Sequence, residues 1–544
     1  MMELSIDKRS SGTYYRIRES YREGDKVKKR TIRYLGTLEN ILERFSKPIP
    51  EDVELGTVSF GPAAAVRWAF EDLGLDDLFA NFLNPEENHG FPAWKKIFLL
   101  VWRRFFQDMS MKAAVEMYDE QVFPFWWRED ITTVQRFYQF LGENLDEEKI
   151  ENLQEELTRR ILDEEQIKEC YLDTTNYCTY VQDDTKYLRI GKSKDKVVGR
   201  RLVGLSLALT GEGLPVLSTA YPGNRHDSKL FSELFGKVCQ RIESVGSDLE
   251  EVTIVFDRGF DDGDNYDLSR LSEPHIVAGV KKNWNSVGEK IDNADLDEFQ
   301  LSHETNHGKC YVKDSGSVQI GKGKWRIVLS YHDKTREKIR KKMEEARSET
   351  EDLLDHQREK IKKKGRGRPI TEDGIEEKLR EVLGKWYGCL DWSFDSEERE
   401  LEVGGWNEEW DRYYETAGVH AVITDHEDWS PSKVVRTYFG RKGIESMFHL
   451  TKKALVVPVE PPYVKEDHLV RAHLFLIFVG LLCYQHIRKE LPENLSDEKV
   501  KSAMKMLEMV IAVEDESLQF RLANVNEKTK PILSNLELKK YLPE

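Results

Sequence analysis

The chain has 544 residues, of which 33% are charged and 39% hydrophobic, and a formal net charge of −17. This length exceeds what one compact core holds, and the apolar share excludes a chain that is disordered throughout. The longest apolar run, Leu474–Tyr484, is shorter than the roughly 20 residues of a membrane span, and Met1–Arg9 lacks the apolar segment of a signal peptide. The six cysteines include no C-x-x-C pair, which argues against a disulfide framework and a zinc ribbon. We therefore expect a reduced, cytoplasmic protein with no membrane segment.

Positive charge is concentrated locally despite the acidic total. Residues 1–36 contain ten Lys/Arg and five Asp/Glu, and six of the nine residues in 360–368 are basic. Local basic patches are sufficient to contact nucleic acid, so the net charge does not exclude a DNA partner.

The first two regions along the chain are predicted to be a hairpin and a helical domain. Thr13–Leu35 alternates around a Gly24–Asp25 turn, which predicts a basic β-hairpin region over 1–60. Its cations either contact DNA ends or form a solvated face. Residues 61–165 repeat apolar side chains at helical spacing and are interpreted as a helical DNA-binding domain. Thr132 and Thr133 begin either a recognition-type helix carrying Arg136 or an ordinary bundle helix.

Residues 166–282 show a mixed α/β pattern. Buried strands are predicted at Lys168–Asp173, Val252–Asp257 and His275–Lys281, with a hairpin around Gly211–Gly213 and a helix from Ser228. The rhythm breaks over 283–416, which we interpret as an insertion, and resumes over 417–490. A long charged helix from Lys334 to about Lys363 has a thin apolar stripe, typical of a projecting or partner-contacting arm. Residues 491–544 are expected to be a C-terminal helical region.

Two acids are predicted to lie at strand ends, Asp173 in YLDTTNY and Asp257 in VFDRGF. Each is either a turn former or helix cap, or a ligand for a divalent cation at the edge of a buried sheet. Two such acids on one sheet favour the metal site.

The segment YFGRKGIESMFHLTK, Tyr438–Lys452, carries a more specific pattern. On a helix that turns about 100° per residue, Tyr438, Arg441, Glu445 and Lys452 share one narrow face. The opposite side is apolar. Gly440 and Gly443 lower helix propensity by up to about 1 kcal/mol each, which indicates that another group approaches closely. The alternative is an amphipathic helix with an ordinary polar face.

The spacing Y-x2-R-x3-E-x6-K resembles the signature of DDE transposases of the insertion-sequence-four-like superfamily, in its long-insertion branch. YLDTTNY, PGNRHDSK (222–229), FDRGFDD (256–262) and KEDHLVRAHLFLIFVGLL resemble further blocks of that family, as does the N-terminal YYRIRESYREGDKVKKRTIRYLG. The resemblance therefore covers nearly the whole chain.

This resemblance implies a ribonuclease H-like mixed-sheet core in which Asp173, Asp257 and Glu445 form the catalytic triad and bind two Mg²⁺ or Mn²⁺ ions. Three carboxylates hold such a pair, and the pair activates a water or a DNA 3′-hydroxyl for attack on phosphorus. Tyr438, Arg441 and Lys452 are then expected to contact DNA phosphates, with Arg258 as a further candidate. His226–Asp227 either orients a metal ligand or caps a helix.

Two further features of the inserted region stay open. Related enzymes flip a base onto a Trp of the insertion. The sequence does not choose among Trp284, Trp325, Trp406 and Trp410 for that role, and core packing is the favoured interpretation for each one taken singly. Lys362–Pro369, KKKGRGRP, resembles an AT-hook whose Arg366 and Arg368 enter the minor groove; a flexible basic linker is the alternative.

The predicted function is a DNA transposase that cuts and joins the ends of an insertion sequence. Its expected partners are its terminal inverted repeats and target DNA, and it is expected to act as a homodimer associated with the nucleoid. A catalytically silent transposase-derived DNA-binding protein and a ribonuclease H-like nuclease are the alternatives.

Overall fold

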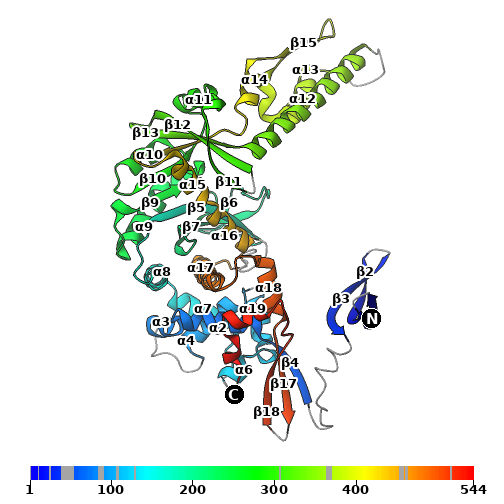
Figure 1. Cartoon of the computed structure of the whole chain (residues 1–544), viewed down its shortest axis with the longest axis vertical. Helices are drawn as coiled ribbons and strands as arrows, with labels where there is room; N and C mark the ends of the chain where they lie inside the picture. Colours follow the sequence, from blue (N-terminus) through cyan, green and yellow to red (C-terminus); the bar gives the residue numbers. More distant parts are fainter. Residues whose placement is uncertain are drawn as a thin grey trace.

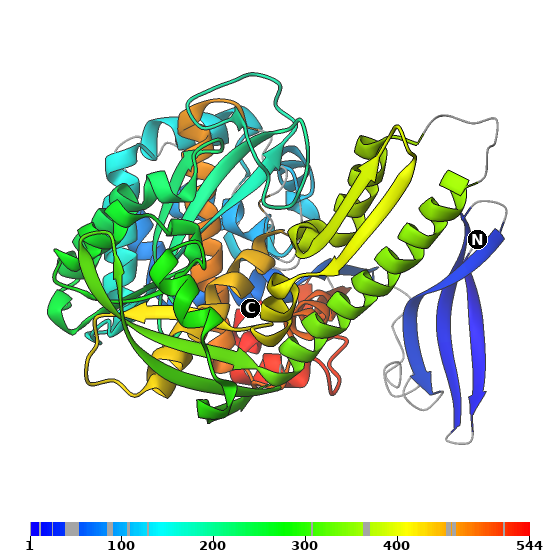
Figure 2. The ribbon, with the colours of Figure 1, turned by 90° about the horizontal axis from the view of Figure 1, so that it is seen from above.

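The protein is described here from a computed structural model of residues 2–9, 12–23, 26–37, 54–83, 91–105, 109–127, 130–305, 308–362, 370–452, 459, 464–514 and 517–543. Its body is built around a large twisted sheet, with a helical layer below it and a projecting arm above it (Figure 1). A small N-terminal sheet lies apart from this body in both views (Figures 1 and 2).

The small sheet contains the predicted basic hairpin. Its strands are antiparallel in the order β1-β2-β3, with bounds β1 Met2–Arg9, β2 Gly12–Glu23 and β3 Lys26–Thr37. Glu23 pairs with Lys26 across the turn, which confirms the hairpin that the alternating pattern predicts.

The central sheet has ten strands within the described residues, in the order β11-β12-β13-β16-β10-β9-β5-β7-β6, with β8 also paired to β7. Their bounds are β5 Glu169–Thr179, β6 Arg189–Ile190, β7 Arg201–Thr210, β8 Pro215–Pro222, β9 Thr253–Phe256, β10 His275–Val280, β11 Gln300–Thr305, β12 Gly308–Ile320, β13 Gly323–His332 and β16 His420–Thr424.

The strand order β8-β7-β5-β9-β10 is that of a ribonuclease H fold. β5, β7 and β8 form an antiparallel meander, and β9 and β10 then add parallel to β5 on its other side. The apolar runs that the sequence shows at β5, β9 and β10 suit strands covered on both faces. The predicted mixed α/β core is confirmed.

The predicted insertion, 283–416, contains strands of the central sheet as well as a separate body. β11, β12 and β13 continue the central sheet, because β13 pairs antiparallel with β16, which itself pairs with β10. The sequence pattern missed this connection because the periodicity of a strand does not show which other strands it pairs with. The separate body of the insertion begins at Asp333.

Side-chain alternation divides the sheet into two faces. Leu172, Phe256 and Ala278 pack into one core with helices α9 Asp227–Ser244, α10 Gly263–Arg270 and α11 Asn285–Asp292. Tyr171 and Val255 point to the opposite face, which α15 Pro431–Gly440 covers, followed by α16 Lys442–Lys452. Odd-numbered residues of β5 and β9 therefore face the α15–α16 side.

The N- and C-terminal helices share a single core rather than forming the separate regions 61–165 and 491–544. α17 Asp467–Glu490 passes through this core, and 83% of its most apolar window is buried although its length and composition meet the criterion for a membrane span. The helices around it are α2 Gly61–Asp72, α3 Leu75–Phe82, α4 Ala93–Trp102, α5 Met111–Glu116, α6 Phe123–Trp127, α7 Val134–Asn144, α8 Glu147–Leu162, α18 Asp497–Met506 and α19 Lys530–Asn535.

Two sequence predictions in this layer have different outcomes. Thr133 accepts a hydrogen bond from the Arg136 amide and begins α7 as predicted. The C-terminal region is not wholly helical, because β17 Glu508–Glu514 pairs with β18 Ser517–Ala523 and with β4 Glu54–Ser59.

The arm consists of α12 Asp333–Lys362, α13 Glu372–Leu383, β14 Leu390–Asp395, β15 Glu400–Trp406 and α14 Glu408–Glu415. The predicted long charged helix is confirmed, but its apolar stripe serves a local core. Met343, Ala346 and Leu354 pack against α13, β14 and Trp410. α12 is thus both the projecting element and the support of a small domain (Figure 1).

Candidate functional site

Asp173 and Asp257 lie side by side because of the parallel register of their strands. Leu172 of β5 pairs with Phe256 of β9, so the next residue of each strand is an aspartate. Both aspartates are odd-numbered, so their side chains face α15 and α16. Asp173 does not end its strand as predicted, since β5 continues to Thr179 against β7. It is β9 that stops, and this leaves the edge beside Asp173 open.

Backbone amides fix both carboxylates. The Thr174 amide donates to Asp173 Oδ1 at 2.7 Å, and the Gly259 amide donates to Asp257 Oδ1 at 2.6 Å. Each second oxygen, Oδ2, points to the same cation, Arg441 Nη1, at 3.6 Å. The two aspartates are therefore held before any ligand arrives.

The helix that carries the four signature residues is broken, not continuous. α15 ends at Gly440 and α16 begins at Lys442, with Arg441 between them. The break turns Arg441 toward the sheet and places Glu445 in the first turn of α16. Arg441 Nη2 lies 3.0 Å from Glu445 Oε1, so one guanidinium contacts all three acids.

Burial and charge set the ionisation of the site. Burial raises the pKa of Asp173 to about 7, and repulsion from Asp257 adds to this effect, whereas Lys194, the Thr174 amide and Arg441 oppose it. Burial works against the charge of Arg441, but the neighbouring Tyr438 and the three acids raise the pKa of its guanidinium. The acids are most stable with a cation among them.

Close contacts explain one of the two glycines that lie within the segment Tyr438–Lys452. A methyl group on Gly440 would overlap the Tyr171 phenol, whereas one on Gly443 would meet no atom within 4 Å. Tyr438 is buried and lies against Gly279 of β10 in the same way. The α15–sheet packing thus depends on Gly440 and Gly279, and the prediction of a close approach is confirmed for Gly440 alone.

The remaining predicted DNA-contacting residues are placed differently. Arg258 follows Asp257 and lines the cavity into which the three acids open. Lys452 does not stand beside the three acids; its Nζ pairs with Asp195 Oδ2 at 2.6 Å, and it lines a second hollow of about 870 Å³. Arg366 and Arg368 lie outside the described residues.

The three acids open into a cavity of about 710 Å³ between the sheet and the arm. Its walls come from both, including Lys282 of the core and Lys385, Trp386 and Tyr413 of the arm. Glu445 and Lys194 also line the second hollow, so the two cavities meet at the acids. In the view from above, the arm stands beside the α15–α16 segment (Figure 2).

Two residues of this site, Lys194 and Trp386, are not predicted by the sequence pattern. Lys194 Nζ bonds Thr174 O at 2.6 Å and pairs with Asp227 Oδ2 at 2.9 Å, which ties Asp227 to the β5 side of the site. Trp386 is the tryptophan of the arm that lines the cavity beside the three acids. Neither carries a motif, because Lys194 sits in a charged loop and Trp386 in a short 3-10 turn, Gly384–Cys389.

The four tryptophans named from the sequence make contacts away from the three acids. Trp325 is fully buried in the sheet core and Trp410 is 3% exposed in the arm core. Trp284 donates to Asp261 Oδ1 at 2.8 Å, and Trp406 packs on Trp410. None of the four lines the cavity beside the three acids within the described part of the chain.

Comparisons with known proteins identify the family of the chain. Residues 173–456, more than half of the chain, match the Transposase DDE domain, and residues 5–51 match the N-terminal domain of IS1634 family transposases. No curated protein sequence matches significantly. Among solved structures, the chain is similar to that of a piggyBac transposase synaptic complex with hairpin DNA, with 9% identity, a TM-score of 0.37, and coverage of 83% of this chain and 82% of that chain. The chain belongs to the DDE transposase family and is a DNA transposase of an insertion sequence.

Proposed function

We propose that this transposase cuts the ends of its own insertion sequence and joins them to target DNA, using Asp173, Asp257 and Glu445 as ligands for two divalent ions. The observation that carries the proposal is that three acids distant in sequence converge on one guanidinium. DDE transposases generally use divalent metal ions.

The donor set fits Mg²⁺ or Mn²⁺. Both are hard cations that prefer carboxylate oxygens, and each aspartate keeps one oxygen, Oδ2, directed toward the space that Arg441 now fills. A pair of bound ions would activate a water or a DNA 3′-hydroxyl and stabilise the leaving oxygen. Glu445 is about half exposed, with 53% of its side chain accessible, so it can adjust to complete the site.

The cationic side chains are proposed to hold DNA. Arg441 is positioned to exchange carboxylate for phosphate oxygens when the site is loaded, since a guanidinium binds either group through two parallel hydrogen bonds. Arg258, Lys282 and Lys385 line the same cavity and supply positive charge on both walls. Tyr438 orients Arg441, whose guanidinium carbon lies 5.4 Å from the centre of its ring.

Lys452 is proposed to contact a neighbouring stretch of the DNA backbone, because it lines the second hollow with Arg200, away from Asp173 and Asp257. Two hollows that meet at Glu445 suit a strand that enters along one and leaves along the other. Phosphate contacts of this kind fix the position of DNA without reading its sequence.

Trp386 is proposed as the stacking partner for a base flipped during hairpin formation. It is half-buried, lines the catalytic cavity and is flanked by Lys385. Trp386→Ala should reduce 2-aminopurine fluorescence changes in the duplex next to the cleaved bond, whereas Trp406→Ala should leave them unchanged. Equal signals from both variants would remove Trp386 from this role.

The biological setting follows from the chemistry. Two DNA ends must be joined together, so we propose a homodimeric synaptic complex at the nucleoid in the cytoplasm. The basic hairpin of β2 and β3 and the segment 362–369 are proposed as further DNA contacts, at the element's ends and in A·T-rich minor grooves respectively.

The test is cleavage of a duplex that carries the inverted repeats flanking the gene. Wild-type protein should cut it with Mg²⁺ and not with EDTA. Asp173→Asn, Asp257→Asn and Glu445→Gln should each lower the rate at least about 10³-fold while the band shift on the same duplex stays unchanged. Asp261→Asn, on a neighbouring acid outside the triad, is the matched control and should cut. Metal-dependent cutting by any triad variant at the wild-type rate would refute the assignment.

A further inference from the structure

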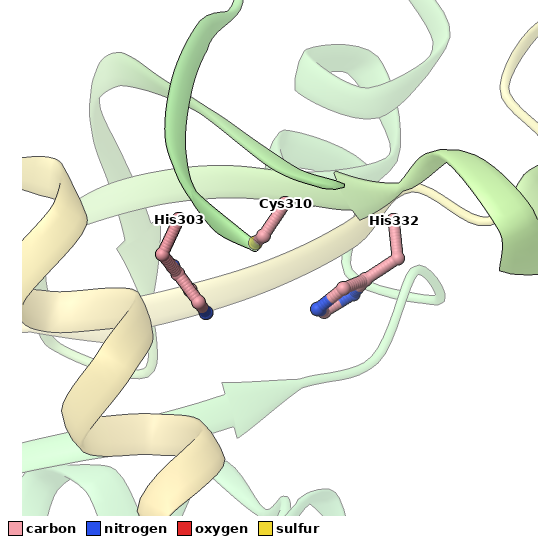
Figure 3. A group of neighbouring side chains, drawn as sticks. All are labelled: His303, Cys310 and His332. Carbon is pink, nitrogen blue, oxygen red and sulfur yellow. The ribbon is translucent and has the colours of Figure 1, made fainter. Parts of the chain in front are cut away.

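Three potential metal ligands meet on the outer strands of the central sheet, outside the carboxylate site. They are His303 on β11, Cys310 on β12 and His332 on β13, and one ligand atom of each lies within 4.8 Å of the others. Figure 3 shows the two imidazoles and the thiol directed toward a common space.

The strand register produces this cluster. Cys310 pairs with His303 on one side and with His332 on the other, so the three residues form one row across adjacent strands. Directly paired residues on one face have Cβ atoms about 5 Å apart, which is close enough for their side chains to share an ion. Cys310 faces the α15 side together with Val312 and Val328.

The row is partly enclosed rather than spread on the surface. Cys310 is fully buried, His332 is 6% exposed and His303 is half-buried. Phe439 of α15 packs its ring edge-on against His332, with ring centres 5.0 Å apart.

We propose that His303, Cys310 and His332 bind a zinc-class ion, a borderline-soft divalent cation. Thiolate and imidazole are the ligands that Zn²⁺ prefers, whereas Mg²⁺ prefers the carboxylates of the catalytic site. Zinc–ligand bonds of about 2.1 to 2.3 Å place the ligand atoms of one tetrahedral ion about 3.6 Å apart, so only small side-chain rotations separate the row from a bound geometry. This site is independent of the proposed catalytic role of the acids.

Two cationic side chains, Arg436 and Lys442, lie near the row, so the thiolate of Cys310 must supply the negative charge that a bound ion requires. Burial raises the pKa of Cys310 to about 11, while the same two cations favour its thiolate. A coordinating ion deprotonates such a thiol outright and neutralises the group in place.

The location gives the ion a structural role. His332 immediately precedes Asp333, the first residue of α12, and His332 contacts α15 through Phe439. Tyr438 and Arg441 lie one and two residues from Phe439. An ion at this row therefore ties the base of the arm, the edge of the sheet and the helix that positions Arg441 together.

The experiment is Co²⁺ titration of the full-length chain, followed by near-ultraviolet absorption. A thiolate bound to Co²⁺ gives a sulfur-to-metal charge-transfer band, and a carboxylate site cannot produce it. We expect the band to saturate at one ion per chain and to disappear when Zn²⁺ is added. Cys310→Ala should abolish it. Cys389→Ala, which removes a buried thiol from the arm core, is the matched control and should keep it.

A second measurement covers the case in which Cys310→Ala does not fold. In the wild-type chain, Zn²⁺ should slow alkylation of Cys310 at least tenfold relative to EDTA, as measured by mass spectrometry, and leave the alkylation of Cys239 unchanged. Absence of the charge-transfer band, its persistence in folded Cys310→Ala, or equal protection of both cysteines would each overturn the proposal.

Discussion

The two halves of the proposed catalytic site are built differently. The sheet half, Asp173 and Asp257, is fixed by strand register and by backbone amides, and Asp173 is only 9% exposed. The helix half, Glu445, stands on a separate short helix with 53% of its side chain accessible and is held by Arg441. The sheet half is therefore organised before ligands bind, whereas the helix half depends on a break in a helix and on one cation. This difference predicts which changes disturb chemistry and which disturb folding.

Outside the three acids themselves, loss of Arg441 should have the largest effect, because this side chain joins the two halves. Arg441→Ala leaves three like charges without their shared cation, and we expect a loss of cleavage of at least about 10²-fold and a smaller dependence of DNA affinity on salt. Lys442→Ala removes the adjacent, exposed cation, which no ion pair joins to the acids in the described residues, and should change the rate little. The rates and the salt slopes of both variants are measured on the same end duplex; equal effects would contradict the bridging role.

The pH dependence of stability should distinguish the halves next. An acid whose pKa is higher in the folded chain binds its proton more tightly there, so its contribution favours folding at low pH. The raised pKa of Asp173, about 7 against 3.8, therefore predicts that metal-free protein loses up to about 4 kcal/mol of stability between about pH 4 and pH 7.

Chemical denaturation across that range measures the effect. Asp173→Asn should flatten the profile, and Glu445→Gln, on the exposed half, should leave it close to wild type. A Glu445→Gln profile as flat as that of Asp173→Asn would contradict this prediction, because the two acids would then contribute equally to the pH dependence of stability.

The smallest effects are expected at the glycines of the helix half. Gly440→Ala forces a methyl group against Tyr171 and should cost about 1–3 kcal/mol of unfolding free energy. Gly443→Ala meets no atom within 4 Å and lies on a helix, so it should be neutral or stabilise by up to about 1 kcal/mol. Thermal unfolding of the pair measures the difference, and similar melting temperatures would contradict the described packing of α15.

Much of this site is predictable from the sequence, because the alternation of side chains along a strand and the spacing of residues along a helix follow from the local sequence. The apolar runs before Asp173 and Asp257 predict buried strands of one sheet, and the signature spacing predicts that Glu445 joins them. Tertiary contacts decide the rest. The continuation of β5 past Asp173 depends on β7, and the helix break at Arg441 depends on contacts with the sheet.

Other features depend on partners far along the chain. Lys452 pairs with Asp195, which no periodicity links to it. β11–β13 join the central sheet only through β16, and the metal-ligand row then follows from their pairing. Trp386 lies at the cavity beside the three acids because of the way the arm folds. Nothing in the sequence around Trp386 distinguishes it from the other tryptophans of the chain.

The most direct test of the account is Mn²⁺ binding at the carboxylate site, followed by electron paramagnetic resonance in a Cys310→Ala background that removes the thiolate ligand of the other site. We expect two ions per chain in the presence of end DNA, with at least one lost in Asp257→Asn and in Glu445→Gln. Unchanged Mn²⁺ binding in both variants would contradict the claim that the sheet and helix halves form a single metal site.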